Sequence, residues 1–188
     1  MPYWPPRLTC DRPEFLTRAL WISALALGCS TSACTEGAIR NGATIGAPAP
    51  AYAARSLAGD SASLAGLRGT VVLFNIWATW CHPCRAEIPQ LQHLHELYAP
   101  QGFTVIGVSI DAGGMESGIK SFMRDFRMSY PVWLDPDENV SSQFLTLGVP
   151  STFLIDRTGT IRWRKTGPIS EGDAELTAAI ARALVGPS

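Results

Sequence analysis

Two apolar runs stand out in the middle of the chain, VVLFNIW at 71–77 and FTVIGVSI at 103–110. Both are rich in β-branched residues and lack a polar alternation, which is typical of strands buried on both faces of a sheet. Two shorter runs, STFLID and IRWRK, flank the turn sequence RTGT, which predicts a β-hairpin. PVWLD at 131–135 is expected to be a further short strand.

Helical spacing follows each of the long runs. After the first run, apolar side chains recur at Ile88, Leu91, Leu94 or His95, and Tyr98. This period predicts a helix that begins around Cys81, with Pro83 tolerated in its first turn and Pro89 kinking its interior. A second amphipathic helix is marked by Ile119, Phe122, Met123 and Phe126. A short helix at 139–145 and a closing helix at 171–186 complete the pattern.

The expected order of elements is β, β-α-β-α, β-α, β-β-α. This order is typical of the α/β class, with a central mixed sheet flanked by helices on both faces. At 188 residues the chain is long enough for one domain with its own core. The 15 Lys and Arg against 16 Asp and Glu give a net charge of −1, so the charge balance does not indicate nucleic acid as a partner.

The amino-terminal segment predicts export. An apolar run of ten residues at 19–28 follows Arg18 and precedes the small residues GCSTSA. A run this short cannot span a bilayer, which needs about 20 residues, but it suits the core of a secretory signal. The stretch before it is long for such a signal, which is consistent with a start codon placed too far upstream.

ALGC, which ends at Cys29, resembles the lipobox of bacterial lipoproteins, in which the cysteine is lipidated. Two outcomes stay open: a lipid anchor on Cys29, or cleavage near Ala33 that leaves a soluble periplasmic protein. We therefore expect a leader at 1–34, a flexible tether at 35–50 that is rich in Gly, Ala and Pro, and a folded domain at 51–188.

Cysteine usage narrows the chemistry. Of five cysteines, Cys10, Cys29 and Cys34 lie in the leader, and the domain keeps only Cys81 and Cys84. Small exported domains that are stapled by disulfides carry several well-separated pairs. A single close pair in an oxidising compartment is therefore expected to be functional rather than a structural disulfide.

A CxxC pair can also be half of a metal site, but the other half is missing from this chain. A structural zinc site needs four ligands, and no second cysteine pair follows. His93 and His95 fall on different faces of the predicted helix, about three turns from the pair, and His82 sits between the cysteines. Haem attachment needs a histidine directly after the second cysteine, where this chain has Arg85. We expect no metal site.

A redox pair agrees with the position of the cysteines at a helix start. The unpaired backbone N–H groups there stabilise a Cys81 thiolate, which is the form that attacks disulfides. Cys84, one turn later, can resolve the resulting mixed disulfide. Trp80 can shield the pair so that one sulfur alone is approachable. The Cys81–Cys84 disulfide is then the redox group itself, and no other cofactor is expected.

These residues carry a family resemblance. WATWCHPCRAEIP at 77–89, preceded by VVLFNIW and followed downstream by GVPSTFLID, resembles the thioredoxin superfamily, and specifically its exported TlpA/ResA/DsbE-like branch. The resemblance spans 48–184 and implies a thioredoxin-like fold with thiol–disulfide exchange as its activity. It also implies that Pro150, after Val149, is a cis proline facing the disulfide, where partner backbone pairs as an extra strand. The expected substrate-binding residues are Trp80, His82, Pro83 and Val149.

One departure from thioredoxin concerns the proton. Thioredoxin carries a buried Asp in the strand before its CxxC, whereas this chain has Asn75, which cannot act as a base. The branch instead resembles this chain at Glu87, three residues after Cys84 and on the same side of the helix. We hypothesise that Glu87 tunes the thiol pKa values and shuttles a proton. The alternative is an exposed first-turn Glu that the helix dipole favours.

The direction of exchange has two opposing indications. A protonated His82 would stabilise the Cys81 thiolate and favour oxidation of partners. The resembled branch consists of reductases that are recharged by a membrane-embedded thiol donor and keep the haem-binding cysteines of apocytochrome c reduced. We therefore predict a reductase of periplasmic partner proteins of the cytochrome c maturation type, which membrane tethering would suit.

Two alternative functions use the same cysteines. A thiol peroxidase of the peroxiredoxin group would place one cysteine in a P-x-x-x-T/S-x-x-C setting, whereas this chain has WCHPC. A copper carrier would separate its cysteines by three residues and add a later histidine, but no histidine follows His95.

Three features outside the CxxC have local interpretations. Asp111, which two nearby glycines follow, is expected to be a turn or helix-cap residue. Trp133 and Trp163 are expected to pack in the core, and RWRK at 162–165 is expected to form an exposed, solvated strand.

Overall fold

The computed structural model describes residues 43–186. Its strands are β1 (Ala53–Ser56), β2 (Ser61–Ser63), β3 (Val71–Trp77), β4 (Phe103–Ser109), β5 (Val132–Leu134), β6 (Ser151–Ile155) and β7 (Ile161–Thr166). Its helices are α1 (His82–Tyr98), α2 (Glu116–Asp125), α3 (Asn139–Phe144) and α4 (Ala174–Val185), with short 3-10 turns η1 (Leu64–Leu67) and η2 (Ala99–Gln101). The predicted order of elements is confirmed, with a two-stranded hairpin where the first strand was expected.

The strands of the described region form one mixed sheet in the order β2-β1-β5-β4-β3-β6-β7. β3 lies near the middle, parallel to β4 and antiparallel to β6. Every residue of β3 is buried, which agrees with a run that is apolar except for Asn75. The predicted strand at 71–77 is confirmed with the same bounds. Turn residues precede the run and the CxxC segment follows it, which explains where the strand begins and ends.

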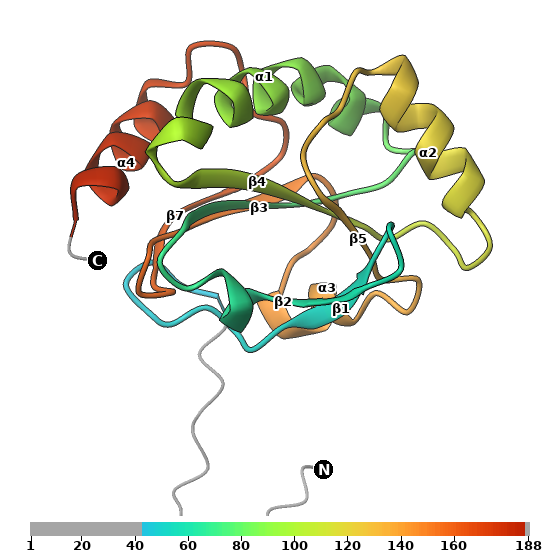
Figure 1. Ribbon diagram of the computed structural model, residues 1–188, viewed down its shortest axis with the longest axis horizontal. Helices are drawn as coiled ribbons and strands as arrows, with labels where there is room; N and C mark the ends of the chain where they lie inside the picture. Colours follow the sequence, from blue (N-terminus) through green and yellow to red (C-terminus); the bar gives the residue numbers. More distant parts are fainter. Residues whose placement is uncertain (1–42, 187–188) are drawn as a thin grey trace, which may run out of the picture. The chain divides into compact units, whose positions relative to one another are not determined.

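Helices cover both faces of the sheet, as predicted. Figure 1 shows α1, α2 and α4 along one face, whereas α3 lies on the other face, where the β1–β2 end of the sheet also curves. Neighbouring side chains of β3 point to opposite faces. Phe74 stacks on Phe144 of α3 at a ring distance of 4.9 Å, and Asn75 donates a hydrogen bond to Glu87 of α1.

The helix after β3 positions the cysteines. α1 runs from His82 to Tyr98 without interruption at Pro89, and it buries the predicted stripe of Ile88, Leu91 and Leu94 against the sheet. Its N-cap is Cys81, one residue before the first helical residue. The predicted helix start is therefore confirmed, and the redox pair lies where the carboxyl end of β3 meets the amino end of α1.

The β6–β7 hairpin is confirmed, and its cations have partners. Arg162 pairs with Asp156 at 2.5 Å, and Lys165 pairs with Asp173 at 2.7 Å. Arg164 donates to the backbone carbonyl of Ala43. The expectation of an exposed, solvated RWRK strand holds only in part, because Arg162 is exposed but Arg164 and Lys165 are half-buried and all three side chains have acceptors nearby. Trp163 is buried, as is Trp133, which confirms both as packing residues.

The segment before β1 packs on the domain from residue 43 onward. Ala43 is buried, the backbone N–H of Gly46 donates to the carbonyl of Ile161, and Pro48 forms a β-bridge with Thr160. These contacts hold part of the expected tether at 35–50 against β7. The expected leader, with Cys10, Cys29 and Cys34, lies outside the described residues. Within 43–186, no helix combines the length and the apolar character that a membrane crossing requires.

Candidate active site

Cys81 and Cys84 form a disulfide at the start of α1, with their Cα atoms 5.3 Å apart. The Cys81 sulfur accepts a hydrogen bond from the Cys84 backbone N–H at 3.2 Å, so it occupies the position of a helix N-cap acceptor. Pro83 fits the first turn, where a missing N–H costs no helical bond. Cys81 keeps 4% of its surface exposed and Cys84 keeps none. Both cysteines are therefore largely enclosed, and Cys81 is the more exposed of the two.

Glu87 lies one turn after the pair and is fully buried. Its Oε1 accepts from the side-chain amide of Asn75 at 2.8 Å, and its Oε2 accepts from the backbone N–H of Ile169 at 2.8 Å. The alternative of an exposed first-turn Glu is wrong, because these two donors offer the carboxylate a satisfied site between α1, β3 and the loop before α4. The Asn75 amide also donates to the Thr152 hydroxyl at 2.9 Å, so it joins β3 to β6 as well.

Burial sets the protonation behaviour of Glu87. Burial raises the pKa of Glu87 to about 7, although the hydrogen bonds from Ile169 and Asn75 and the charge of Lys165 act in the opposite direction. Burial, assisted by the Glu87 charge, also raises the pKa of Tyr130 above its ordinary value. Glu87 is therefore a carboxyl group that changes its protonation near neutral pH, whereas the Tyr130 phenol stays neutral there.

The peptide bond between Val149 and Pro150 is cis, as predicted. Pro150 directly precedes β6, whose Ser151 pairs with Ile76 of β3. The β6 strand thus carries the cis proline to the same end of the sheet as the redox pair. Pro150 is buried and its carbonyl accepts from the Gly167 backbone N–H at 2.9 Å, whereas Val149 is half-buried.

A groove with a volume of about 380 Å³ runs between the cysteine loop and the segment before the cis proline. Its lining residues are Trp80, Ile110, Glu138, Ser141, Thr146, Leu147, Gly148 and Val149. Two apolar side chains stand open to solvent here: Leu147 is 100% exposed and Trp80 is 63% exposed. The structure therefore brings two of the expected substrate-binding residues, Trp80 and Val149, to one groove.

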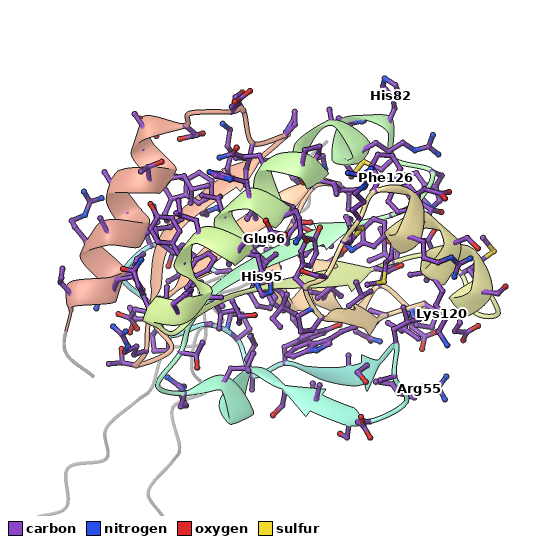
Figure 2. The ribbon with its side chains drawn as sticks, turned by 45° about the horizontal axis from the view of Figure 1, so that its top comes forward. Arg55, His82, His95, Glu96, Lys120 and Phe126 are labelled. Atoms are coloured by element: carbon purple, nitrogen blue, oxygen red, sulfur yellow. A yellow bond between two sulfur atoms is a disulfide. The ribbon has the colours of Figure 1, made fainter. Side chains whose placement is uncertain are left out.

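The other two expected substrate-binding residues, His82 and Pro83, do not line this groove. Both are exposed in the first turn of α1, and Figure 2 shows His82 pointing outward at that end of the helix. Trp80 lines the groove and is open to solvent, whereas Cys84, in the first turn of α1, is fully buried.

The sequence interpretation missed two groups at the site. Asp111 is neither a turn nor a cap residue: it is buried and accepts hydrogen bonds from the backbone and the hydroxyl of Thr79. Its position after a strand, at the edge where the CxxC follows the neighbouring strand, is the signal that could have found it. The Ile169 N–H has no such signal, because every residue other than proline has a backbone N–H group.

No metal site emerges from the described part of the chain. Residues 43–186 contain no group of three or more His, Cys, Asp or Glu side chains that could hold an ion. His95 is instead half-buried in the middle of α1, where Figure 2 shows it beside Glu96, and its Nδ1 accepts from the Val105 backbone N–H.

Known proteins are similar to this chain in sequence and in fold. The AhpC/TSA family matches residues 45–164. The thiol-disulfide oxidoreductase ResA of Geobacillus kaustophilus is 30% identical over 131 residues, which cover 70% of this chain and 74% of the relative. ResA of Bacillus subtilis is 30% identical over 126 residues, which cover 67% of this chain and 69% of the relative.

Solved structures agree with these relatives. A candidate thiol:disulfide interchange protein DsbE from Chlorobium tepidum has a TM-score of 0.69 at 29% identity, covering 75% of this chain and 98% of that chain. A DsbF homologue from Corynebacterium diphtheriae has a TM-score of 0.63 at 27% identity, covering 71% of this chain and 85% of that chain. The names of these relatives favour neither the peroxidase nor the copper carrier. The chain therefore belongs to the AhpC/TSA family and is a thiol-disulfide oxidoreductase of the ResA and DsbE type with a thioredoxin-like fold.

Proposed function

We propose that this protein reduces disulfides of partner proteins, with Cys81 as the attacking thiol and Cys84 as the resolving thiol. The observation that carries the proposal is the asymmetry of the pair: Cys81 keeps 4% of its surface exposed, whereas Cys84 keeps none and lies one turn from the buried Glu87. A pair arranged in this way accepts a partner at one sulfur and completes the exchange from the other.

The exchange proceeds in two steps. The reduced Cys81 thiolate attacks one sulfur of the partner disulfide, which breaks that bond, releases a partner thiolate and forms a mixed disulfide. Cys84 then loses its proton and attacks the Cys81 sulfur. The second partner thiolate leaves, and the Cys81–Cys84 disulfide forms as the partner gains two electrons.

Glu87 serves as the proton acceptor for Cys84 in the second step. A carboxyl group whose pKa is about 7 can take up and return a proton at neutral pH, which a carboxyl at its ordinary value does poorly. Asn75 and Ile169 hold the carboxylate in place through the two bonds of 2.8 Å. Glu87 thereby takes the part that a buried Asp in the strand plays in thioredoxin.

The groove beside the pair receives the partner polypeptide. Its apolar walls, Trp80 and Leu147, suit apolar side chains next to the partner cysteine, and Glu138 suits a basic one. The backbone at Val149 and the cis Pro150 pairs with the partner as an additional strand.

The cellular setting is also part of the proposal. The apolar amino-terminal run and the lipobox-like ALGC support an exported, periplasmic protein that a lipid on Cys29 can anchor. The resemblance of WATWCHPCRAEIP to the TlpA/ResA/DsbE-like branch supports a membrane-embedded thiol donor and apocytochrome c as partners. A reductase is expected to have a potential nearer to that of thioredoxin, about −270 mV, than to that of DsbA, about −120 mV.

Trapping tests the proposal directly. In the full chain, Cys84→Ser should accumulate partner proteins on Cys81 through a bond that a small thiol reductant releases, because the resolving step is blocked. Cys81→Ser should trap no partner. Equal trapping by both variants would show that the two cysteines do not have these separate roles.

A further inference from the structure

Asp111 holds the loop that carries Cys81. It follows β4, is 4% exposed, and faces Thr79, two residues before Cys81. Its Oδ1 accepts from the Thr79 hydroxyl at 2.6 Å, and its Oδ2 accepts from the Thr79 backbone N–H at 3.0 Å. The Ser109 hydroxyl donates to Oδ2 at 2.7 Å, so neither carboxylate oxygen lacks a donor.

Arg85 holds the same loop from the other side. Its Nε and Nη2 donate to the Thr79 carbonyl at 3.0 and 2.7 Å, and its guanidinium lies 5.7 Å from the centre of the Phe122 ring. The Thr79 N–H and the Thr79 carbonyl belong to consecutive peptide groups. Both peptide groups are therefore fixed, by Asp111 at one and by Arg85 at the other.

We propose that Asp111 is a positioning residue for thiol–disulfide exchange, which keeps the Cys81 sulfur at the amino end of α1 through Thr79. The proposal rests on Cys81 being the attacking thiol. Reduction removes the covalent link from Cys81 to Cys84, and Cys81 lies outside the first helical turn. The Thr79 anchor then keeps the sulfur facing the Cys84 N–H, where the helix start stabilises a thiolate.

Positioning and simple charge make opposite predictions. A negative carboxylate near a thiol disfavours the thiolate, so loss of the Asp111 charge alone would lower the Cys81 pKa. Loss of the anchor would raise the Cys81 pKa, because the sulfur would no longer keep its place at the helix start. The sign of the change in Asp111→Asn therefore separates the two roles.

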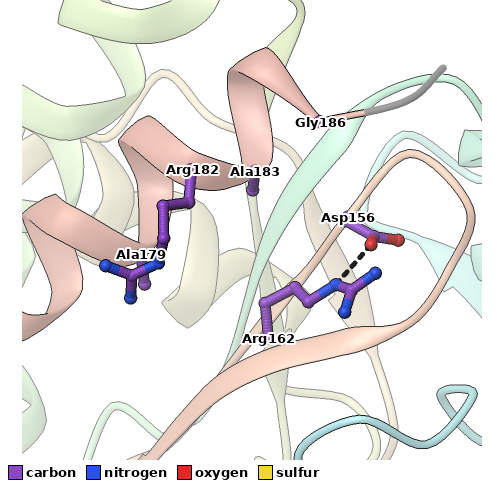
Figure 3. Close-up of a pocket in the computed structure, with 6 residues that line it drawn as sticks. All are labelled: Asp156, Arg162, Ala179, Arg182, Ala183 and Gly186. Atoms are coloured by element: carbon purple, nitrogen blue, oxygen red, sulfur yellow. Dashed lines mark hydrogen bonds and ion pairs between the residues drawn. The ribbon is translucent and has the colours of Figure 1, made fainter.

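Asp156 provides a matched control. It is 8% exposed and accepts from the Thr158 backbone N–H at 2.9 Å and from the Thr158 hydroxyl at 2.7 Å. It lies in the β6–β7 turn, where Figure 3 shows its ion pair with Arg162. Asp156→Asn thus disturbs the same kind of Asp–Thr contact without touching the cysteine loop.

The experiment measures the reactivity of Cys81 in the reduced full chain. Iodoacetamide modification is followed across pH at the Cys81 peptide by mass spectrometry, which separates Cys81 from the other cysteines. Asp111→Asn should lower the rate at neutral pH about threefold to tenfold, which corresponds to a rise of roughly half a unit to one unit in the Cys81 pKa. The single amide oxygen of Asn cannot serve all the donors that the carboxylate serves. Asp156→Asn should match the wild type.

Changes at Thr79 keep the proposal testable where Asp111→Asn folds poorly. Thr79→Ser retains both donors to Asp111, so Cys81 should react at the wild-type rate. Thr79→Val loses the hydroxyl, and its rate of Cys81 modification should lie between those of the wild type and Asp111→Asn. A wild-type or lowered Cys81 pKa in Asp111→Asn, or an equal change in Asp156→Asn, overturns the positioning role. If Cys81→Ser, with Asp111 and Thr79 unchanged, trapped partners on Cys84, the proposed function would be overturned instead.

Discussion

The Asn75 side-chain amide donates a hydrogen bond of 2.8 Å to the buried Glu87 carboxylate, and this contact joins the central strand β3 to α1 beside the redox pair. An amide in the strand cannot act as a base, but it can orient one that the helix supplies. In the proposed mechanism the acid–base group therefore comes from the helix and not from the strand, and burial raises its pKa to about 7.

Glu87→Gln should change how stability depends on pH. The folded-state pKa of about 7 lies above the ordinary value of 4.5, so the folded protein holds this proton more tightly than the unfolded chain. The stabilisation that Glu87 contributes is therefore complete below pH ~4.5 and is lost as the pH rises to ~7, by up to ~3 kcal/mol. Urea denaturation of the oxidised protein should show the free energy of unfolding of Glu87→Gln rising relative to wild type across this range.

The same variant should lose the inflection near pH 7 in the rate of disulfide exchange, because its amide takes no proton from Cys84. Glu96→Gln is the control, since Glu96 is exposed on the same helix. If the two variants gave the same pH profiles, Glu87 would have no special part in proton transfer.

Asn75→Ala should raise the Glu87 pKa above its wild-type value. The Asn75 hydrogen bond lowers that pKa, and its loss leaves Oε1 without its donor. The rate inflection should move to higher pH, with a loss of about 1–3 kcal/mol in the free energy of unfolding. Thr152→Val breaks the other contact of the same amide and should leave the inflection in place. An unchanged inflection in Asn75→Ala would contradict this coupling.

The sequence predicts those parts of the fold that depend on local pattern. β3 agrees to the residue, because a run of seven largely apolar residues that is rich in β-branched side chains and follows a turn favours a buried strand. The start of α1 also agrees, and in both cases the residues that decide the structure are neighbours in the chain. The cis peptide before Pro150 agrees as well, but that expectation came from the family resemblance.

The rest depends on contacts between distant residues. Glu87 was expected near Cys84, but one hydrogen-bond donor of its buried carboxylate is the backbone N–H of Ile169, 82 residues further along the chain. Asp111 looked like a turn residue, because its partner Thr79 lies 32 residues away. The groove includes Leu147, an apolar residue that is fully exposed, which runs against the usual burial of such side chains.

Leu147→Asp should weaken the binding of protein substrates without slowing the thiol–disulfide exchange itself. Leu147 offers its whole side chain to a partner at the groove, so a charge there opposes the docking of apolar segments. The KM for a disulfide-bearing protein such as insulin should rise by about tenfold, as expected for the loss of one apolar contact. Exchange with a small symmetrical disulfide should keep its rate. Leu97→Asp is the control, at an exposed position outside the groove, and an equal effect on KM would remove the groove from substrate binding.

His82→Ala should make the protein a stronger reductant. His82 is exposed in the first turn of α1, next to the Cys81 N-cap, where a positive charge stabilises the thiolate and with it the reduced form. Its removal should lower the reduction potential by up to ~30 mV, or about tenfold in the equilibrium with glutathione. His93→Ala, an exposed histidine further along the same helix, should leave the potential unchanged. A charge at this exposed position acts through solvent, so about 1 M salt should diminish the difference between the two variants. If the reduction potential rose in His82→Ala, or shifted equally in both variants, groups other than His82 would set the potential of the cysteine pair.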